Sequence, residues 1–235
     1  PPAPLQPIPV MGEPFERLIL DCVGPLPKSK SGYQYILTLM CTATRYPEAI
    51  PLRNLKAKTI VKELIKFCST FGLPRVIQTD QGTNFKSKLF EQVLQGISVS
   101  HVVSSAYHPQ SQGALERFHQ TLKSMMRAHF QQGEWDDYLR QVALAYNTSP
   151  HSSTGFTPFF LTHGREARLP ANLLLPKSSP QSPTKSVPEY AVDMISELED
   201  VFTAVAQNSE HAYHQQKRHC DRNLNFTPYQ EGDLV

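Results

Sequence analysis

The sequence lacks the features that place a chain in a membrane or an export pathway. It has no run of about 18 apolar residues, the length needed to span a bilayer. Its first ten residues, "PPAPLQPIPV", contain no basic stretch followed by an apolar one, which is the pattern of a secretory signal. We therefore expect neither a membrane-spanning segment nor a membrane partner.

Cysteine is scarce, and charge of either sign is not in large excess. The four cysteines are scattered, with no C-x-x-C pair: Cys22, Cys41, Cys68 and Cys220. Without an export pattern, free thiols are the expected state. The net charge of +2 and the pI of about 8.5 are mildly basic, and alone they select no class of partner. Internal repeats are also absent.

The chain does contain enough apolar residues for a core. With 235 residues, 40% of them hydrophobic, it suits one ordinary domain with appendages. Short apolar runs predict strands at 16–24, 33–43, 46–52, 74–80 and 97–104, and helical spacing predicts helices at 56–72, 84–96, 112–130, 135–149 and 189–223. Neighbouring strands followed by strands that alternate with helices predict an α/β fold, a mixed sheet with helices packed on it.

Three acids stand where such a fold gathers functional side chains. Asp21 ends the first predicted strand, Asp80 ends a later one, and Glu116 opens a helix, with 35 residues between Asp80 and Glu116. The ends of strands are where α/β folds place ligand sites. Carboxylates brought together need cations, and oxygen ligands of this kind suit Mg²⁺ or Mn²⁺. Two such ions about 4 Å apart can support phosphoryl transfer.

Each acid has a simpler explanation when it is taken alone. An Asp at the end of a strand is usually a cap or turn former, and "DQG" after Thr79 is an ordinary turn sequence. Glu in a first helical turn is favoured by the helix dipole. Asp21 is the most informative of the three, because it interrupts the apolar run "LILDCVG" at a desolvation cost.

Four motifs together are similar to those of a known family. "LDCVGPLP", "TRYPEAIPL", "FGLPRVIQTDQGTNF" and "SSAYHPQSQGALERFHQTLK" resemble, in order and spacing over about residues 14–165, the integrase core of Gypsy-type LTR retrotransposons, relatives of retroviral integrases. The resemblance implies an RNase H-like fold with a five-stranded mixed sheet, and a catalytic triad of Asp21, Asp80 and Glu116 that holds two Mg²⁺ or Mn²⁺ ions. One departure is Cys41, where many relatives carry an acid; this acid is not part of the triad, so we expect no loss of chemistry.

The family's reaction is implied in the same way. Water first trims the 3′ ends of the element DNA, and each new 3′-OH then attacks a phosphodiester of target DNA. The implied partners are element DNA ends, target DNA and further copies of the chain, as a dimer or tetramer. Action in the nucleus is expected because the substrate is chromosomal, although the sequence has no clear Lys/Arg-rich import run.

The resemblance also implies how the chain is divided. The expected parts are a proline-rich linker, the catalytic core, a Pro/Ser-rich linker, a helical linker and the truncated start of a C-terminal β module, at 1–13, 14–165, 166–188, 189–225 and 226–235. The family's His/Cys zinc module is not seen in the sequence. We therefore expect this chain to be a fragment of a longer protein.

DNA contacts can be argued from helical spacing. Glu116, Gln120, Lys123 and Arg127 are separated by four, three and four residues, so they share one helix face. Lys123 and Arg127 suit phosphates, and Gln120 suits a base edge or sugar. The alternative is that this stripe is only the solvated face of an amphipathic helix.

Further DNA contacts are expected near the same site. The resemblance places the turn after Asp80 and the loop before Glu116 beside it, which gives the candidates Gln81, Asn84, Tyr107, His108 and Gln110. His108 suits either a role near a leaving group or a role in structuring the loop before Pro109, and the second is favoured. Gly113 suits a hinge.

One other cluster invites a metal hypothesis. The segment "HAYHQQKRHC" holds His211, His214, His219 and Cys220, but its spacing does not match common zinc sites. An ordinary linker helix is the favoured interpretation.

Two other function classes stay open. A domesticated, non-catalytic DNA-binding protein derived from an integrase would need no metal, and the intact set of acids argues against it. A cut-and-paste transposase or an RNase H-type nuclease would share the metal chemistry. The loop–helix "HPQSQGALER" and the strand "TRYPEA" favour an integrase over both.

Overall fold

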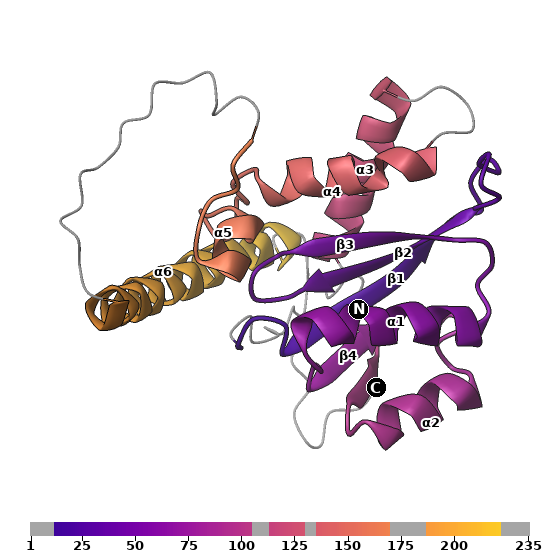
Figure 1. The fold of residues 1–235 in the computed structure, drawn as a ribbon, viewed down its shortest axis with the longest axis horizontal. Coiled ribbons are helices and arrows are strands. Elements are labelled where there is room, and N and C mark those ends of the chain that lie inside the picture. The colour runs from indigo at the N-terminus through magenta and orange to yellow at the C-terminus, as the bar shows by residue number, and fades with distance from the viewer. Residues whose placement is uncertain (1–11, 105–112, 130–134, 170–186, 222–235) are drawn as a thin grey trace, which may run out of the picture.

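A five-stranded mixed sheet forms the centre of the protein. The computed structural model describes residues 12–104, 113–129, 135–169 and 187–221. The strand order is β3-β2-β1-β4-β5; β1 pairs antiparallel with β2 and parallel with β4 (Figure 1). The strands are β1 Arg17–Val23, β2 Tyr35–Cys41, β3 Pro47–Leu52, β4 Val76–Thr79 and β5 Ser100–Val103. The predicted fold class is confirmed.

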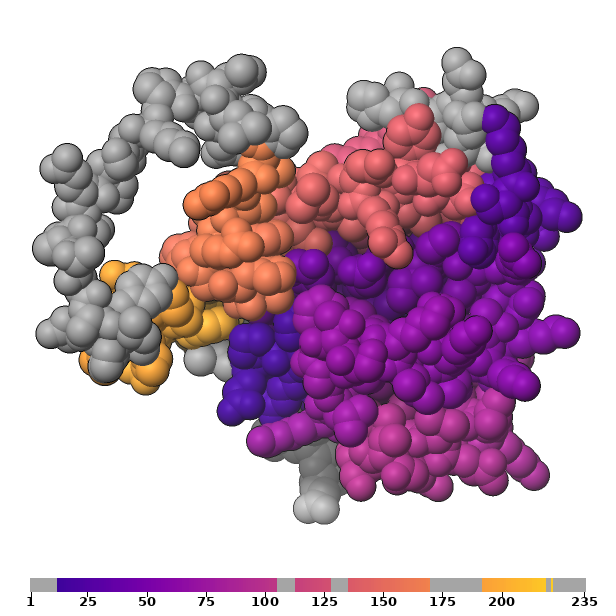
Figure 2. All heavy atoms as spheres, in the orientation of Figure 1, coloured from indigo at the N-terminus to yellow at the C-terminus, as the bar shows by residue number. Residues whose placement is uncertain are grey.

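Six helices are described, and two groups of them cover opposite faces of the sheet. They are α1 Ala57–Phe71, α2 Lys88–Gly96, α3 Gly113–His129, α4 Trp135–Asn147, α5 Pro158–His163 and α6 Val187–Asp221. One core cluster joins the sheet to α1 and α2, and the other joins it to α3 and α4. In the space-filling view, α2 lies at one end of the molecule and α4 lies at the opposite end (Figure 2).

The helix α1 forms where its apolar spacing predicts. Ile60, Leu64 and Phe67 lie on one buried face, in the core cluster shared with α2. Gly72 ends the helix at φ 88°, a conformation that favours glycine, and its N–H donates to the carbonyl of Cys68. The predicted glycine cap is therefore confirmed.

Two element predictions need correction, and one helix was missed. The second helix begins at Lys88 rather than residue 84, because the Ser87 hydroxyl accepts from the N–H of Phe90 and caps the helix there. The strand β5 covers only Ser100–Val103, whereas the sequence predicted a strand at 97–104. The alternating sequence also suggested one buried face, but no residue of β5 is fully buried in its place at the edge of the sheet. The short helix α5 was not predicted, although its cap Thr157 and the glycine after it were visible in the sequence.

The long helix α6 docks on the turn that follows α4. Asn208 Nδ2 donates to the carbonyl of Thr154 at 3.0 Å, and Ser209 Oγ donates to that of Ser153 at 3.2 Å. The predicted helix at 189–223 is thus present, from Val187 to Asp221. In the described part of the chain, no helix is long and apolar enough to cross a membrane.

The structure tests the predicted free thiols but not the predicted linkers. Cys22, Cys41 and Cys68 are free thiols, as predicted, and the side chain of Cys220 lies outside the described residues. Residues 1–11, 170–186 and 222–235 also lie outside. The predicted division into linkers, core and terminal module therefore stays a prediction.

The turn on which α6 docks predicts a loss of stability in acid. The Nδ1 of His151 accepts from the Ser153 N–H at 3.2 Å, and burial lowers the pKa of His151 from 6.5 to about 4. The folded protein therefore binds this proton less tightly than the unfolded chain, so stability is lost as the pH falls from about 6.5 towards 4. The loss from this group should be about 2 kcal/mol.

Urea unfolding of the wild type and of His151→Asn between pH 7 and 4 measures this loss. Asn keeps an oxygen that can accept from the Ser153 N–H but does not titrate in this range. The variant should lose about 2 kcal/mol less than the wild type over the same interval. An identical pH dependence of the two proteins would contradict the prediction.

Candidate active site

The first acid, Asp21, faces the α3 side of the sheet. Side chains alternate along a strand. In β1, Leu18 and Leu20 belong to the core shared with α1, whereas Ile19 and Val23 belong to the core shared with α3. Asp21 lies between Ile19 and Val23 in this alternation, so its carboxylate enters a mostly apolar layer under α3.

The second acid, Asp80, reaches the same edge of the sheet. β1 and β4 are parallel, with Leu20 opposite Thr79, so Asp21 and Asp80 each come one residue after this pair. The turn after Asp80 fixes its carboxylate: Oδ1 accepts from the Gly82 N–H at 2.9 Å. A Cβ at Gly82 would lie 2.8 Å from Asn84 Oδ1 and 2.9 Å from this oxygen, so a larger residue there would displace these two side chains.

The third acid, Glu116, lies in the first turn of α3. The helix is held on the sheet by Leu115, Phe118 and Leu122, which are buried in the second core. Glu116 is exposed on the adjoining face. The packing therefore fixes the helix and leaves this carboxylate free to meet a ligand.

The electrostatics place the three acids within reach of one another. The pKa of Asp21 is raised from 3.8 to about 6, chiefly by burial, and further by the charges of Asp80 and Glu116. Two features lower this pKa in part: the Cys22 N–H donates to Asp21 Oδ1 at 2.6 Å, and Lys123 brings a positive charge nearby. The site thus carries unbalanced negative charge that a cation would relieve.

Two residues that were not predicted complete the surroundings of Asp21. Thr38 lies opposite Asp21 in the β1–β2 register and contacts His119 Nε2 through its hydroxyl at 2.7 Å. The Nδ1 of His119 lies 3.8 Å from Asp21 Oδ2. Burial, followed by the charge of Lys123, lowers the pKa of His119 to about 4, so its ring is neutral at pH 7. The sequence gave one sign of these two residues: each is polar at a position where the pattern of its element, β2 for Thr38 and α3 for His119, calls for a buried residue.

The predicted stripe on α3 is present. Gln120, Lys123 and Arg127 are all exposed, as is Glu116, while the opposite side of the helix is buried. Lys123 is close enough to the acids for its charge to lower the pKa of Asp21. Whether these side chains bind DNA stays a prediction.

Of the five other residues predicted to contact DNA, the structure describes two. Gln81 is exposed, and its Oε1 accepts from Lys86 Nζ at 3.2 Å; Asn84 is partly buried, and its Nδ2 lies 3.7 Å from Cys22 Sγ. Both follow Asp80 closely, as predicted. The other candidates lie outside the described residues: Tyr107, His108 and Gln110.

The three acids fit a divalent cation by their chemistry. Their donors are carboxylate oxygens, which Mg²⁺ and Mn²⁺ prefer, and their mutual repulsion favours a bound cation. Among the described residues, however, no group of three His, Cys, Asp or Glu side chains is already gathered closely enough to hold a metal. The chemistry of the donors therefore supports an ion here, and the number of ions stays a prediction.

The weaker zinc hypothesis gains no support. His211 Nε2 contacts Gln215 at 2.8 Å, and His214 lies 3.7 Å from Glu210, both within the helix α6. The side chains of His219 and Cys220 lie outside the described residues. These contacts are typical of an ordinary polar helix.

Comparison with known proteins identifies relatives of this arrangement. Residues 13–109 match the family described as "Integrase core domain". The chain is 29% identical over 224 residues to the retrovirus-related Pol polyprotein from transposon 412 of Drosophila melanogaster, which covers 94% of this chain and 18% of that protein. This chain spans less than a fifth of the length of the curated relatives it matches.

Solved structures share the fold at low sequence identity. The HTLV-2 integrase catalytic core domain in complex with magnesium, in a trimeric form, has a TM-score of 0.50 at 15% identity and covers 64% of this chain and 98% of that chain. The simian T-cell lymphotropic virus intasome in complex with PP2A regulatory subunit B56 gamma gives a TM-score of 0.56 at 20% identity, over 79% of this chain and 66% of that chain.

The unbalanced charge of the site predicts that Asp21 costs stability. A raised pKa means that the folded state binds the proton more tightly, so stability is lost as the pH rises from about 4 through 6. Without metal, Asp21→Asn should therefore raise the free energy of unfolding at pH 7.5 by about 1–2 kcal/mol, discounted because the side chain is 23% exposed.

Urea unfolding in a chelator between pH 4 and 7.5 measures this gain. It should vanish near pH 4, where the wild-type carboxyl is protonated when folded. Asp200→Asn, at an exposed position of α6, is the matched control and should change little. A destabilised Asp21→Asn protein at pH 7.5 would show that the carboxylate is well solvated and the account of the site wrong.

Proposed function

We propose that this chain is the catalytic core of a Gypsy-type retrotransposon integrase, because residues 13–109 match the family described as "Integrase core domain". It is a polynucleotidyl transferase that also cuts DNA as an endonuclease. Its substrates are the ends of the element DNA and a target duplex. The ordered homology to a transposon polyprotein across 94% of the chain supports this assignment.

One observation carries the proposal. Parallel pairing of β1 with β4 brings Asp21 and Asp80 to one edge, and the packing of α3 adds Glu116 within electrostatic reach. Burial raises the pKa of Asp21, and the charges of Asp80 and Glu116 raise it further, against the hydrogen bond from the Cys22 N–H and the charge of Lys123. Acids that served only to stabilise the fold would not be expected to lie close together, because replacing one of them would remove the repulsion between their charges.

The three acids are the residues that would hold two Mg²⁺ or Mn²⁺ ions. When bound, such ions make an attacking oxygen more nucleophilic and stabilise the charge on the leaving one. Asp21 lies deepest and is bonded to its own strand through the Cys22 N–H, so it suits a fixed, shared ligand. Asp80 is held by its turn, and Glu116 is carried by the first turn of α3.

The reaction consists of two displacements at phosphorus. In end processing, a water oxygen bonds to phosphorus, the bond to the 3′ oxygen breaks, and that oxygen takes up a proton to become the new 3′-OH. In strand transfer, the oxygen of this 3′-OH bonds to a target phosphorus and loses its proton, the bond from that phosphorus to the target 3′ oxygen breaks, and the departing oxygen takes up a proton to become a new 3′-OH. The chain forms no covalent intermediate and consumes no nucleotide.

The exposed stripe on α3 positions the DNA. Lys123 and Arg127 provide cations for backbone phosphates about two and three helical turns from Glu116, and Gln120 provides an amide for a base edge or sugar. Gln81 and Asn84, in the turn after Asp80, are further proposed contacts, as are three residues that precede α3 in the sequence: Tyr107, His108 and Gln110. These contacts orient a phosphodiester towards the acids.

Assembly and location follow from the substrate. Two element ends must reach one target, so we propose that the active form is a homo-oligomer, a dimer or tetramer, that works in the nucleus. The solved relatives described as a trimeric form and as an intasome support assembly in general. A domesticated, non-catalytic DNA-binding protein would bind DNA with the same affinity whether or not the acids and the metal were present.

Removal of Glu116 tests the proposed chemistry. The purified chain is mixed with a branched DNA substrate and Mg²⁺ or Mn²⁺, and joining of the strands is followed on a gel. Glu116→Gln keeps the size of the side chain and removes its charge. Joining should fall by at least about 10²-fold, because the charge that develops in the transition state is no longer stabilised.

The matched control is Glu63→Gln on α1, on the opposite face of the sheet. It should join DNA at the wild-type rate. If the wild type is inactive, the same comparison is made with terminal modules added. An inactive longer protein that still binds DNA would favour the non-catalytic binding protein and reject the proposed reaction.

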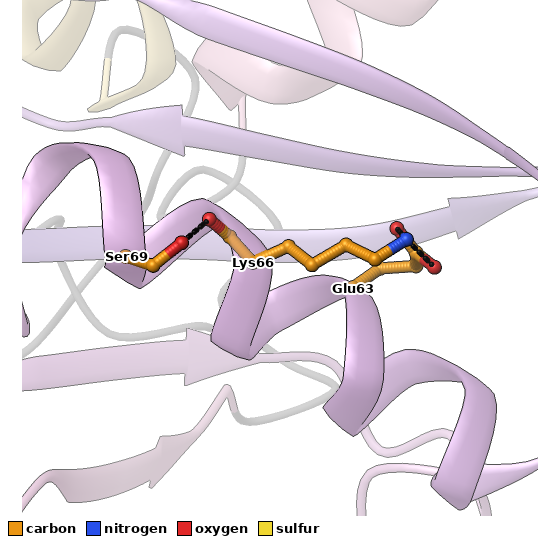
Figure 3. A network of polar contacts seen from close by, with 3 residues as sticks. All are labelled: Glu63, Lys66 and Ser69. Carbon is orange, nitrogen blue, oxygen red and sulfur yellow. Dashed lines mark hydrogen bonds and ion pairs between the residues drawn. The ribbon is translucent and has the colours of Figure 1, made fainter.

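Removal of Lys123 tests the proposed DNA face. Lys123→Ala should weaken DNA binding for all sequences alike and reduce the slope of log affinity against log salt by about 1, since one phosphate contact is lost. Fluorescence anisotropy with a labelled duplex at several salt concentrations measures both. The control is Lys66→Ala, whose ammonium pairs with Glu63 at 2.9 Å on α1 (Figure 3). An equal change in the two variants would mean that the α3 face is only a solvated surface.

A further inference from the structure

A partly buried arginine, Arg45, stands in the turn between β2 and β3. Its Nε is fully buried and has no hydrogen-bond partner among the described residues, whereas the residue as a whole is partly exposed. In the same part of the chain, Arg45 forms no ion pair with an acid. A buried charge is costly unless an opposite charge or hydrogen bonds offset it, so this guanidinium can gain from a ligand.

The turn fixes where the Arg45 side chain begins. Arg45 has a φ of 61°, in the left-handed region that non-glycine residues rarely adopt. Its N–H donates to the carbonyl of Cys41 at 3.0 Å, and the Cys41 N–H donates to that of Tyr46 at 3.0 Å. Residues keep such a conformation only where their surroundings determine it, and they cluster at ligand sites.

Three other parts of the chain bring side chains close to Arg45. Burial, and then the charge of Arg117 on α3, lowers the pKa of Arg45. The ring of Tyr146 on α4 packs edge-on against Phe118 at 5.0 Å and lies 6.1 Å from the ring of His151. Burial raises the pKa of Tyr146 and lowers that of His151, and the charges of both arginines lower the two values. The turn before β3, the helices α3 and α4 and the turn after α4 therefore meet around Arg45.

The neutral ring of His151 adds a hydrogen-bond donor to this group. Burial lowers its pKa to about 4, so the ring is neutral at pH 7. Nδ1 accepts from the Ser153 N–H at 3.2 Å, which places the single ring proton on Nε2. Among the described residues, Nε2 has no hydrogen-bond partner. His151 therefore offers an N–H near two guanidinium groups.

No acid of the described chain balances these arginines. Cys41 lies close to Arg45 in the same turn, but a thiol sulfur is a weak acceptor. Its Sγ already accepts from the N–H groups of Phe15 at 3.2 Å and Thr44 at 3.4 Å. Within the described residues, no carboxylate is among the charges that act on Arg45 or His151. The donors of the two guanidinium groups and the imidazole match the oxygens of a phosphate group.

We propose that Arg45, Arg117 and His151 form a phosphate-binding site, apart from the three acids, and that it takes a backbone phosphate of DNA. Arg117 is exposed and directly follows Glu116, so the site borders the exposed face of α3 that carries Lys123. A duplex on that face presents closely spaced phosphates, and arginine binds a phosphate through two parallel hydrogen bonds. The choice of DNA as the source of the phosphate rests on the proposed function, whereas the binding of a phosphate group does not.

Two substitutions remove the site in different ways. Arg117→Gln removes one of the two charges at an exposed position of α3, so it leaves the buried core intact. Cys41→Asp keeps both arginines and places a carboxylate beside Arg45, where it competes with a bound anion. The matched control is Arg75→Gln, because Arg75 already pairs with Glu16 at 3.3 Å.

Thermal unfolding of the full chain with inorganic phosphate is the first test. Chloride keeps the ionic strength constant, and a chelator prevents any metal held by the acids from binding the phosphate. Phosphate should raise the unfolding midpoint of the wild type, and the concentration dependence gives the affinity. Arg117→Gln and Cys41→Asp should each lower this affinity at least about tenfold, and Arg75→Gln should not. A wild type that gains nothing from phosphate, or an Arg117→Gln variant that binds it equally well, would overturn the proposal.

Fluorescence anisotropy of a labelled duplex tests DNA as the source of the phosphate. In chelator, Arg117→Gln should reduce the slope of log affinity against log salt by about 1, since one phosphate contact is lost. Arg75→Gln should leave the slope unchanged. If Arg117→Gln loses inorganic phosphate but keeps the full slope, DNA is rejected as the source and the site binds a free phosphate.

The joining assay keeps this proposal separate from the proposed function. If the wild type binds phosphate and DNA through this site but never joins DNA, the site stands and the proposed function fails. If the wild type joins DNA while Arg117→Gln and Cys41→Asp bind phosphate and DNA as the wild type does, the site is overturned and the function stands.

Discussion

The burial of one carboxylate, that of Asp21, is the constraint on which the rest of the site depends. It lies on a central strand of the sheet, in a mostly apolar layer, and its pKa rises to about 6. The protein keeps this charge at a cost in stability. Asp80 and Glu116 add charge beside it that a cation would balance, and Thr38 and His119 are the buried polar residues that lie next to it.

Much of this arrangement could be predicted from the sequence. Apolar runs located the strands, and the glycine after Phe71 located the end of α1, because both depend on local chemistry. The interruption of "LILDCVG" by Asp21 indicated a buried acid, and the helical spacing from Glu116 to Arg127 predicted an exposed stripe. These inferences needed only the periods of strands and helices.

The contacts of His119 could not be predicted, because they depend on register. Thr38 faces Asp21 only through the antiparallel pairing of β1 with β2, and His119 reaches both only when α3 packs on that face. Nothing in the sequence states which face a helix covers. The start of α2 was also missed. The helical spacing of apolar residues continues on the N-terminal side of Ser87, but the Ser87 hydroxyl caps the helix, which therefore begins at Lys88.

The central claim is that Asp21, Asp80 and Glu116 converge on divalent cations. Anomalous X-ray scattering from crystals soaked in Mn²⁺ tests it most directly, because the metal is located without reference to activity. We predict peaks between Asp21 and Asp80, and between Asp21 and Glu116, that disappear in Asp21→Asn crystals. Peaks only elsewhere on the protein, or none at concentrations that saturate other Mn²⁺ enzymes, would contradict the account.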